Sequence, residues 1–395
     1  MSEFLLTCNA GSNSLKCALC EIDGKTVCYT FEADRIHGET VAAIKGWEGK
    51  SIIDHEPIES GYDNALSFFY GWIEEALDGY KLVGAGHRVV HGGEDFDGPV
   101  LITPDIRKKL EKLIPLAPLH QPYNLKLIDL IEEKIGDIPQ VACFDTAFHS
   151  GQPWKARQFA LPSDLAKKEG LYRYGFHGLS YDYIAGMLNY YLEDGHTKRV
   201  IVAHLGSGAS MCAMKNGKSI ATTMGFSALD GLMMGKRCGD LDPGVILYLL
   251  KEKNMSAEDI EELLYKKSGL LGVSGISSDM RDLDDNENEA AQRAVELFCY
   301  MAARQMGGLM MALGGIDTLV FTGAMGVNDS IIREKICNYL SWLPLEIDNQ
   351  ANTNNKDFIT TSESEIDVLV IPTNEEAVIA AKTAGILGFK EKRGY

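Results

Sequence analysis

A short pattern that occurs twice in the chain constrains its fold more than any other feature. Residues 6–19 (LTCNAGSNSLKCAL) align without gaps on residues 201–214 (IVAHLGSGASMCAM), and the register matches Gly-Ser, Cys and Ala. Each copy then reaches a Gly-Lys pair and a further β-rich segment, at 26–31 and 219–223. Both copies predict the order strand, turn, strand, hairpin, strand. A single copy is more typical of a polar turn, which Gly, Asn and Ser also favour. Two copies in one register favour a duplicated domain.

The remaining apolar patterns predict an α/β protein with two domains. Helical spacing covers residues 63–80, 104–113, 123–135, 181–192 and 287–313, and short apolar strands cover 140–144, 318–321 and 368–371. A chain of 395 residues is also long for one core. We therefore expect two related domains facing a central cleft, one formed by residues 1–149 with 379–395 and the other by residues 150–378. Chance similarity of two hairpins is the alternative.

Charge and cysteine usage narrow the class of protein. The formal net charge of -18 and the pI near 5.0 disfavour nucleic acid and anionic membranes as partners, so an anionic substrate needs a local basic cluster. The nine cysteines are odd in number and scattered, as expected of reduced thiols in a cytoplasmic protein. Cys17 and Cys20 form a C-x-x-C, but residues three apart on a strand point to opposite faces, which predicts core packing and not a zinc or redox site.

The termini and the most apolar segment give no sign of a membrane protein. The beginning of the chain carries Glu3 and no basic region, so we expect no signal peptide. Residues 306–316 are too short and too rich in glycine to span a membrane.

The phosphate-binding motifs of other nucleotide folds are missing. No G-x-x-x-x-G-K-[ST] occurs, and neither hairpin shows G-x-G-x-x-G between a strand and a helix. Duplicated glycine-rich hairpins are instead similar to those of the actin, sugar-kinase and heat-shock-protein ATPase superfamily, with two ribonuclease H-like domains.

A more specific resemblance extends from one end of the chain to the other. It is carried, in chain order, by residues 9–16 (NAGSNSLK), 87–93 (HRVVHGG), 116–120 (LAPLH), 144–149 (FDTAFH), 174–180 (YGFHGLS), 231–240 (GLMMGKRCGD) and 373–376 (TNEE). Together these segments resemble the acetate kinase family. The resemblance implies phosphoryl transfer between ATP and acetate, giving acetyl phosphate and ADP.

The resemblance assigns the charged residues of such a reaction. Phosphoryl transfer requires positioning of two anions and neutralisation of charge on the moving group. Arg88 and Arg237 match the family's two active-site arginines, whose guanidinium groups can hold carboxylate and phosphoryl oxygens. His177 matches the histidine that donates to the transferring group. His120 and His204 match two further histidines, for which packing and direct contact are equal alternatives.

The metal and the acyl group are assigned in the same way. Asn9, Asp145 and Glu375 match positions associated with Mg2+ or Mn2+, and one or two carboxylates suffice for such an ion. The residues that match the acyl pocket are Val90, Leu119 and Phe176, together with Ala228, where the family has proline. The smaller alanine would leave room for another carbon unless a neighbour refills the space, so propionate is the second choice after acetate.

The nucleotide contacts implied by the resemblance include one segment that departs from the family. The matching residues are Ser12, Ser14, Lys16, His204, Gly206, Ser207, Gly208, Asp279, Met280, Arg281, Ala324, Met325, Gly326 and Asn328. Ala324 replaces a glycine, Met325 an isoleucine and Val327 a glutamate. If that glycine has positive φ, the alanine adds strain and loosens the contacts to the base. The alternative is that Met325 repacks without consequence.

Three alternatives to acetate kinase activity remain at this stage. They are a propionate or butyrate kinase, a family member using another nucleoside triphosphate or pyrophosphate, and an ATPase module of the actin or chaperone kind. The last has no use for Arg88, His177 and Arg237 in one site. The resemblance also implies a homodimer, to which the apolar helix over residues 296–313 would contribute.

Overall fold

The chain folds into two compact units, which are described separately. The structure is a computed structural model and describes residues 2–11, 13–46, 49–77, 79–195 and 198–389. The N-terminal unit comprises Met1–Ser150 with Asn374–Tyr395, and the C-terminal unit comprises Gly151–Thr373. The expected return of the chain at residue 379 is corrected to Asn374, because helix α14 (Glu375–Ile386) is continuous and packs on strands β1 and β6. Glu375 therefore belongs to the N-terminal unit.

The N-terminal unit is built on one mixed sheet of eight strands in the order β5-β4-β3-β2-β1-β6-β8-β7. The strands are β1 (Ser2–Ala10), β2 (Ser14–Glu21), β3 (Val27–Asp34), β4 (Thr40–Lys45), β5 (Ser51–Ile58), β6 (Tyr80–Val89), β7 (Val100–Leu101) and β8 (Gln140–Phe144). β1, β6 and β8 run parallel, whereas β2 is antiparallel to both of its neighbours.

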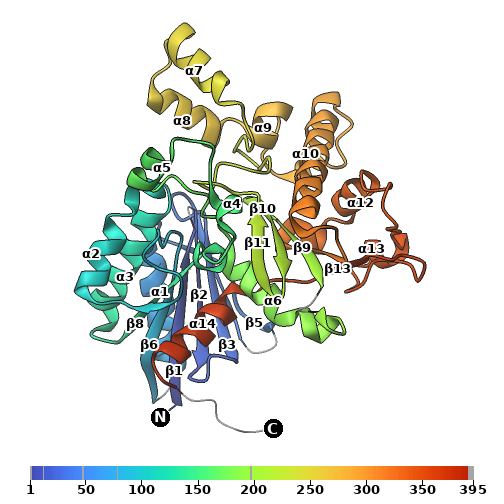
Figure 1. Cartoon of the computed structure of the whole chain (residues 1–395). Coiled ribbons are helices and arrows are strands. Elements are labelled where there is room, and N and C mark those ends of the chain that lie inside the picture. The colour runs from blue at the N-terminus through green and yellow to red at the C-terminus, as the bar shows by residue number, and fades with distance from the viewer. Residues whose placement is uncertain (1, 12, 47–48, 78, 196–197, 390–395) are drawn as a thin grey trace. The chain divides into compact units, whose positions relative to one another are not determined.

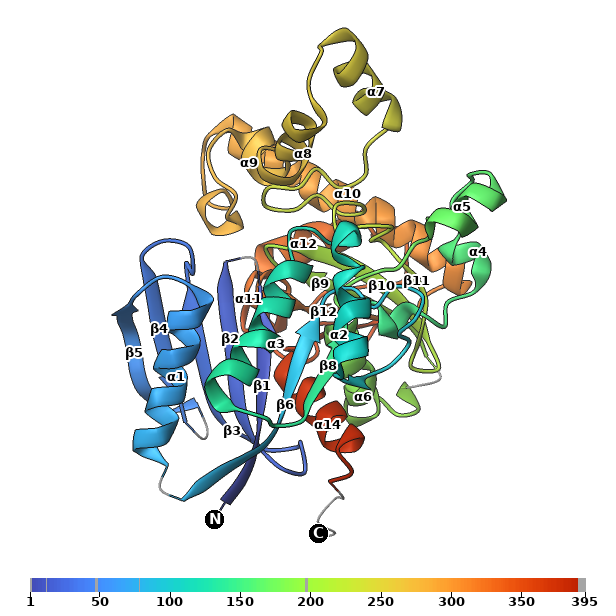
Figure 2. The same ribbon diagram turned by 90° about the vertical axis from the view of Figure 1, so that its left-hand side faces the viewer.

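Helices cover both faces of this sheet. They are α1 (Tyr62–Ala76), α2 (Pro104–Glu111), η2 (Ile114–Leu116), α3 (Gln121–Ile135), η3 (Ala147–His149) and α14. α1 and α3 pack on one face, around Leu6, Cys17 and Phe31, and α14 packs on the other face, against Leu5 and Cys20 (Figure 2). Cys17 and Cys20 thus lie in separate apolar clusters on opposite faces, which confirms the structural interpretation of the C-x-x-C.

The C-terminal unit repeats the central part of this topology. Its sheet has the order β11-β10-β9-β12-β13, with β9 (Arg199–Leu205), β10 (Ala209–Lys215), β11 (Lys218–Thr222), β12 (Thr318–Thr322) and β13 (Asp367–Val370) (Figure 1). β9, β12 and β13 are parallel and β10 is antiparallel to both neighbours, as in β3-β2-β1-β6-β8. The shared order and directions confirm the duplicated, actin-like domain predicted from the repeated hairpins.

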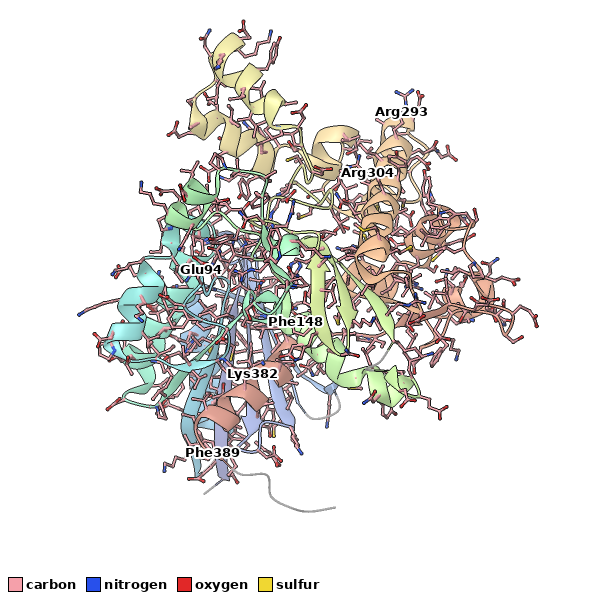
Figure 3. The ribbon with its side chains drawn as sticks, viewed as in Figure 1. Glu94, Phe148, Arg293, Arg304, Lys382 and Phe389 are labelled. Carbon is pink, nitrogen blue, oxygen red and sulfur yellow. The ribbon has the colours of Figure 1, made fainter. Side chains whose placement is uncertain are left out.

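The C-terminal unit carries its helices both against the smaller sheet and away from it (Figure 1). They are α4 (Trp154–Arg157), α5 (Ser163–Glu169), α6 (Gly178–Tyr191), α7 (Pro243–Glu252), α8 (Ala257–Lys266), α9 (Gly269–Ser274), η5 (Met280–Asp282), α10 (Glu289–Leu313), α11 (Gly323–Asn328), α12 (Ser330–Asn338) and α13 (Asn349–Thr353). α10 packs along the sheet, with Arg293 and Arg304 on it (Figure 3). Among the described residues, no helix is both long enough and apolar enough to cross a membrane.

The two hairpins differ by one residue in their turns. Ala10 pairs with Leu15 across the first turn, but Leu205 pairs with Ala209 across the second. The alignment without gaps is therefore wrong from the turn onward: Cys17 pairs with Cys8, whereas the aligned Cys212 pairs with Val202. A one-residue shift moves every side chain of a strand to the other face, so the second strands of the two copies present different residues to their cores.

The predicted elements exist, with corrected ends. The first predicted helix, 63–80, ends at Ala76, and Tyr80 instead begins β6. The second Gly-Lys turn is an Asn-Gly turn, because Asn216 and Gly217 both have positive φ and Lys218 already belongs to β11.

Candidate functional site

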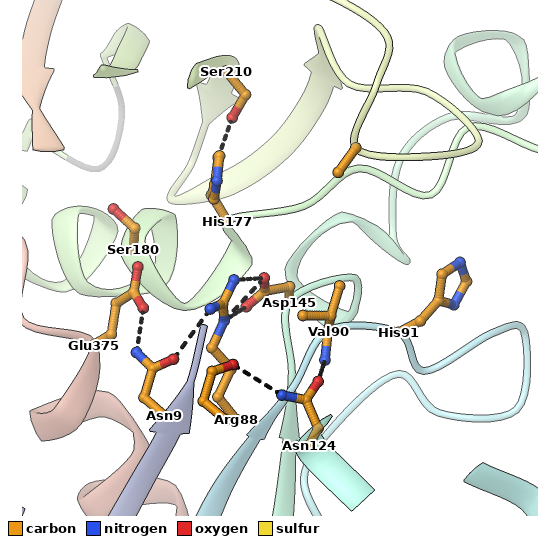
Figure 4. Close-up of polar contacts among 12 residues, drawn as sticks. Asn9, Arg88, Val90, His91, Asn124, Asp145, His177, Ser180, Ser210 and Glu375 are labelled. Atoms are coloured by element: carbon orange, nitrogen blue, oxygen red, sulfur yellow. Dashed lines mark hydrogen bonds and ion pairs between the residues drawn. The ribbon is translucent and has the colours of Figure 1, made fainter. Parts of the chain in front are cut away.

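A hydrogen-bonded network at the ends of β1, β6 and β8 joins four of the predicted residues in the N-terminal unit (Figure 4). Arg88 Nε donates to Asp145 Oδ1 at 3.0 Å, and its Nη2 donates to Oδ2 at 2.7 Å. Arg88 Nη1 donates to Asn9 Oδ1 at 3.1 Å, and Asn9 Nδ2 donates to Glu375 Oε2 at 3.0 Å. Parallel strands bring their carboxyl ends to one sheet edge, and the N-terminus of α14 adds Glu375 there.

The network is shielded from water and rich in negative charge. The Asp145 side chain is 1% exposed and that of Arg88 15%. Burial opposes the charge of Arg88, but the carboxylates of Asp145 and Glu375 outweigh it and raise the pKa of the guanidinium. Burial raises the pKa of Glu375, and the charge of Arg88 offsets part of this rise. Burial also raises the pKa of the neighbouring Glu376. Burial is the largest cause of both shifts, so it disfavours the charged forms of the two glutamates.

These residues fit a magnesium ion held by few protein ligands. No closed group of three or more His, Cys, Asp or Glu is present among the described residues. Glu375 and Asn9 offer the hard carboxylate and amide oxygens that Mg2+ prefers, and they lie next to each other, joined by a hydrogen bond of 3.0 Å. Asp145, in contrast, is bound on both oxygens by Arg88, which makes it a support for the arginine.

Two buried amides support this edge of the sheet, and sequence reasoning missed both. Asn124 Nδ2 donates to the carbonyl of Ala10 at 3.1 Å, and its Oδ1 accepts from the Val90 N–H at 3.0 Å. Gln121 binds the backbone N–H and carbonyl of His91 in the same way. Both amides lie on the buried face of α3. A polar residue among the apolar residues of a helix face indicates a buried hydrogen-bonding role, and this was the signal in the sequence.

Three further predicted residues of this unit belong to the first glycine-rich hairpin. Ser12 lies outside the described residues, and Ser14 begins β2. Lys16 Nζ pairs with Glu32 Oε1 at 2.9 Å. Burial opposes the charge of Lys16, but Glu32, Glu376 and Glu375 together raise its pKa. Lys16 is thus electrostatically linked to the Glu375 carboxylate while held by β3.

The acyl-pocket residues are divided between the units. Val90 is 3% exposed, and Leu119 is partly buried beside His120, which directly precedes α3. Phe176, 2% exposed, and Ala228 belong to the C-terminal unit. The pocket itself therefore stays a prediction.

In the C-terminal unit, His177 adopts an uncommon backbone conformation just before α6. Its φ is 57°, in the left-handed region that non-glycine residues seldom adopt and that clusters at functional sites. Its ring stacks on His204 with centroids 4.4 Å apart. His177 Nδ1 lies 2.8 Å from Ser210 Oγ, and His204 Nδ1 lies 2.8 Å from Ser180 Oγ. Both predicted histidines are therefore oriented by buried hydroxyls.

The turn between β9 and β10 brings a third predicted group to these histidines. A side chain at Gly208 would have its first carbon 3.3 Å from His177 Nε2 and 4.0 Å from Arg237 Nη1. Gly206 and the exposed Ser207 complete the turn. A Cβ at residue 208 would crowd the His177 ring, so glycine lets the turn backbone pass close to the imidazole and near the Arg237 guanidinium, two groups that can donate to an anionic oxygen.

Arg237 is tied to the loop that carries Ala228. Its Nη1 donates to the Ala228 carbonyl at 3.0 Å. The same loop is held by an ion pair of 2.8 Å between Arg173 Nη1 and Asp230 Oδ2, which sequence reasoning missed. Arg173 and Asp230 directly precede two of the matched segments, 174–180 and 231–240, so their position was the available signal.

The two predicted adenosine-binding segments, 279–281 and 324–328, contain both buried and exposed residues. Asp279 binds Arg281 through both carboxylate oxygens, and the Arg281 side chain is 87% exposed. Met280 is buried, so only its backbone is available to a ligand. Ala324 is exposed in α11, and its φ is not positive, so the alanine is not strained there. Asn328 donates to the Ala324 carbonyl at 2.9 Å, and Met325 and Gly326 lie between them.

Comparisons with known proteins identify the family of the chain. The sequence profile of the acetokinase family matches residues 4–381. An acetate kinase of Rhodopseudomonas palustris is 48% identical over 392 residues, covering 96% of this chain and 97% of the relative. A propionate kinase from Francisella tularensis superposes with a TM-score of 0.90 at 36% identity, and an acetate kinase from Porphyromonas gingivalis with 0.85 at 37% identity. Both superpositions cover 98% of this chain and 100% of the solved chain.

Proposed function

Since the chain belongs to the acetokinase family, we propose that it catalyses the reversible transfer of a phosphoryl group between ATP and acetate, giving acetyl phosphate and ADP. The observation that carries the proposal is that His177 Nε2 and Arg237 Nη1 both lie close to the Gly208 backbone in the second glycine-rich turn. Two nitrogen donors near one glycine-rich turn are what a phosphoryl group in flight requires, because its charge is spread over the equatorial oxygens.

In the proposed mechanism the protein positions the two substrates and neutralises charge on the moving phosphoryl group. It forms no covalent bond with either substrate. His177 and Arg237 donate to oxygens of the moving phosphoryl group. Arg88, fixed by Asp145, presents its remaining hydrogen-bonding capacity to acetate or to the acyl phosphate. Transfer is then direct and in line from the donor oxygen to the carboxylate oxygen.

Magnesium would be held by Glu375 and Asn9 together with the substrate phosphates. When bound, the ion neutralises phosphate charge that builds up in the transition state. Asp145 keeps Arg88 in place. Manganese, which prefers the same oxygen ligands, is an expected substitute.

Acetate is the proposed acceptor, and propionate is the alternative. Val90, Leu119, Phe176 and Ala228 are proposed to surround the acyl methyl group. The solved relative named propionate kinase, together with alanine at position 228, supports propionate as a second substrate.

ATP is the proposed donor. Residues of the two glycine-rich turns and of segments 279–281 and 324–328 are its proposed contacts. The exposed, unstrained position of Ala324 supports unchanged ATP binding over the use of another donor.

The arginines provide the test of the proposal. Arg88→Ala and Arg237→Ala should each lower turnover by at least about a hundredfold, because removing one such donor costs roughly 3 kcal/mol in the transition state. Arg107→Ala, which removes an ion pair to Asp129 on the surface, is the matched control and should retain activity. Turnover near that of the control in either variant, with an unchanged circular dichroism spectrum, removes that arginine from the mechanism.

Location and assembly are proposed with the function. Nine free cysteines support a reducing, cytoplasmic location, and the net charge of -18 supports the absence of nucleic-acid partners. A homodimer is proposed from the family, with α10 as one contributing helix. Light scattering on the purified chain distinguishes a dimer from a monomer.

A further inference from the structure

A chain of buried hydroxyl groups leads from α6 to the ring of His177. Tyr181 Oη lies 2.5 Å from Ser210 Oγ, which in turn lies 2.8 Å from His177 Nδ1 (Figure 4 shows the second contact). Tyr181 and Ser210 are both 0% exposed. The Tyr181 N–H also donates to the His177 carbonyl, so the two side chains lie one helical turn apart on the same side of α6.

The acidities of the groups set the direction of these hydrogen bonds. A phenol is a far stronger acid than an aliphatic alcohol, so Tyr181 is the better donor in its contact with Ser210. Burial raises the pKa of Tyr181 well above its ordinary value, which keeps the phenol protonated. Once Ser210 Oγ accepts from Tyr181, the serine hydrogen is available for His177 Nδ1.

The direction of these hydrogen bonds determines which nitrogen of the imidazole carries the proton. A neutral imidazole has one N–H, and a nitrogen that accepts a hydrogen bond is the one without it. If Nδ1 accepts from Ser210, the proton lies on Nε2. Nε2 is the nitrogen that lies close to Gly208, the glycine that Arg237 also approaches.

We propose that Tyr181 and Ser210 act as positioning residues that hold neutral His177 in the tautomer with its proton on Nε2, so that Nε2–H donates to the transferring phosphoryl group. The inference rests on the proposed function for the role of that donor. His204, whose ring stacks on that of His177, has a separate contact with the hydroxyl of Ser180. The positive φ of His177 points its side chain back to β10, where Ser210 lies.

The tautomer is measured directly by nuclear magnetic resonance. Protein labelled with 15N in its histidine rings is recorded near pH 8 in two-bond 1H–15N spectra, and the His177 signals are assigned by their loss in His177→Gln. The wild type should show an unprotonated Nδ1 and a protonated Nε2. In Ser210→Ala the preference should fall toward a mixture of tautomers. Tyr183→Phe, which changes a tyrosine on another side of α6, is the matched control and should leave the His177 signals unchanged.

Turnover supplies the second measurement. Ser210→Ala and Tyr181→Phe should lower kcat by roughly two- to tenfold, the value of one hydrogen bond, with little change in KM for acetate or ATP. A wild-type His177 protonated on Nδ1 overturns the proposal, and so does a tautomer equal in wild type and Ser210→Ala. If a variant does not fold, the wild-type spectrum by itself still shows whether His177 is protonated on Nδ1. Because the spectra are recorded without substrates, a correct tautomer in an enzyme lacking kinase activity would contradict the proposed function and leave the hydroxyl chain standing.

Discussion

Arg333 is a fully buried charge, and its replacement should strongly destabilise the C-terminal unit. The side chain is 0% exposed. Its Nη1 donates to the carbonyls of Gly326 and Val327 at 2.9 and 2.8 Å. Its Nε and Nη2 donate to the side chain and the carbonyl of Asn352 at 2.8 and 2.7 Å, and Nη2 also donates to Asn355 Oδ1 at 2.6 Å. Arg333 thus links the end of α11 to α13.

The cost of Arg333→Met follows from these contacts. Methionine fills much of the volume but leaves the carbonyls of Gly326, Val327 and Asn352 without their donor, and each such buried acceptor costs about 1–3 kcal/mol. The gain from no longer burying a guanidinium, whose pKa burial lowers, offsets part of this. We expect a net loss of about 3–5 kcal/mol in the free energy of unfolding. For a unit of this size that corresponds to a fall in Tm of roughly 6–20 °C.

Urea denaturation followed by circular dichroism measures this loss. Arg293→Met is the matched control in the same unit, because its ion pair with Glu289 is exposed and should contribute less than about 1 kcal/mol. Below the melting temperature, Arg333→Met should also raise KM for ATP more than KM for acetate, since it loosens α11. A loss of stability no larger than that of the control would refute the reasoning.

Three further predictions address pH, the acyl group and the donor. Burial lowers the pKa of His87 to about 4 from 6.5, so its neutral ring stabilises the fold above pH 6.5 and the contribution is lost as the pH falls toward 4. His87→Gln should therefore lose less stability than wild type between pH 7 and pH 5 in urea denaturation, and equal losses would speak against burial of a neutral ring. Ala228→Pro keeps the carbonyl that accepts from Arg237 and should lower the ratio of propionate to acetate kcat/KM at least about fivefold, within the 1–3 kcal/mol that one methylene supplies; an unchanged ratio would mean that position 228 does not line the acyl pocket. Because Ala324 is exposed and unstrained, Ala324→Gly should leave the ATP to GTP preference unchanged, and a shift above about fivefold would be inconsistent with its placement in α11.

Local patterns predicted the elements and the duplication because hairpins and amphipathic helices are specified by nearby residues. The small-residue turns after Ala10 and Leu205 and the buried strand 140–144 all appear in the structure. The one-residue difference between the two turns was not predictable, because an identity match at Cys17 and Cys212 gave no information on which strand residue each would oppose.

The resemblance identified candidate residues but not how they support one another. Asn9 and Glu375 are 366 residues apart in the chain, and no local pattern connects them. Asp145 was predicted near a metal, yet its two oxygens hold Arg88, a role that only the pairing of β6 with β8 reveals. Arg333 gave a local signal, because it shares the buried face of α12 with Ile332 and Ile336, where a charge needs partners.

Trapping of the product tests most directly whether this chain phosphorylates a carboxylate. The purified chain is incubated with acetate, ATP and Mg2+ in the presence of hydroxylamine, which converts an acyl phosphate into a hydroxamate. Acetyl hydroxamate should accumulate in step with ADP, both should depend on acetate, and excess chelator should abolish both. Release of ADP without hydroxamate, independent of acetate, would contradict the account and indicate an ATPase in place of a carboxylate kinase.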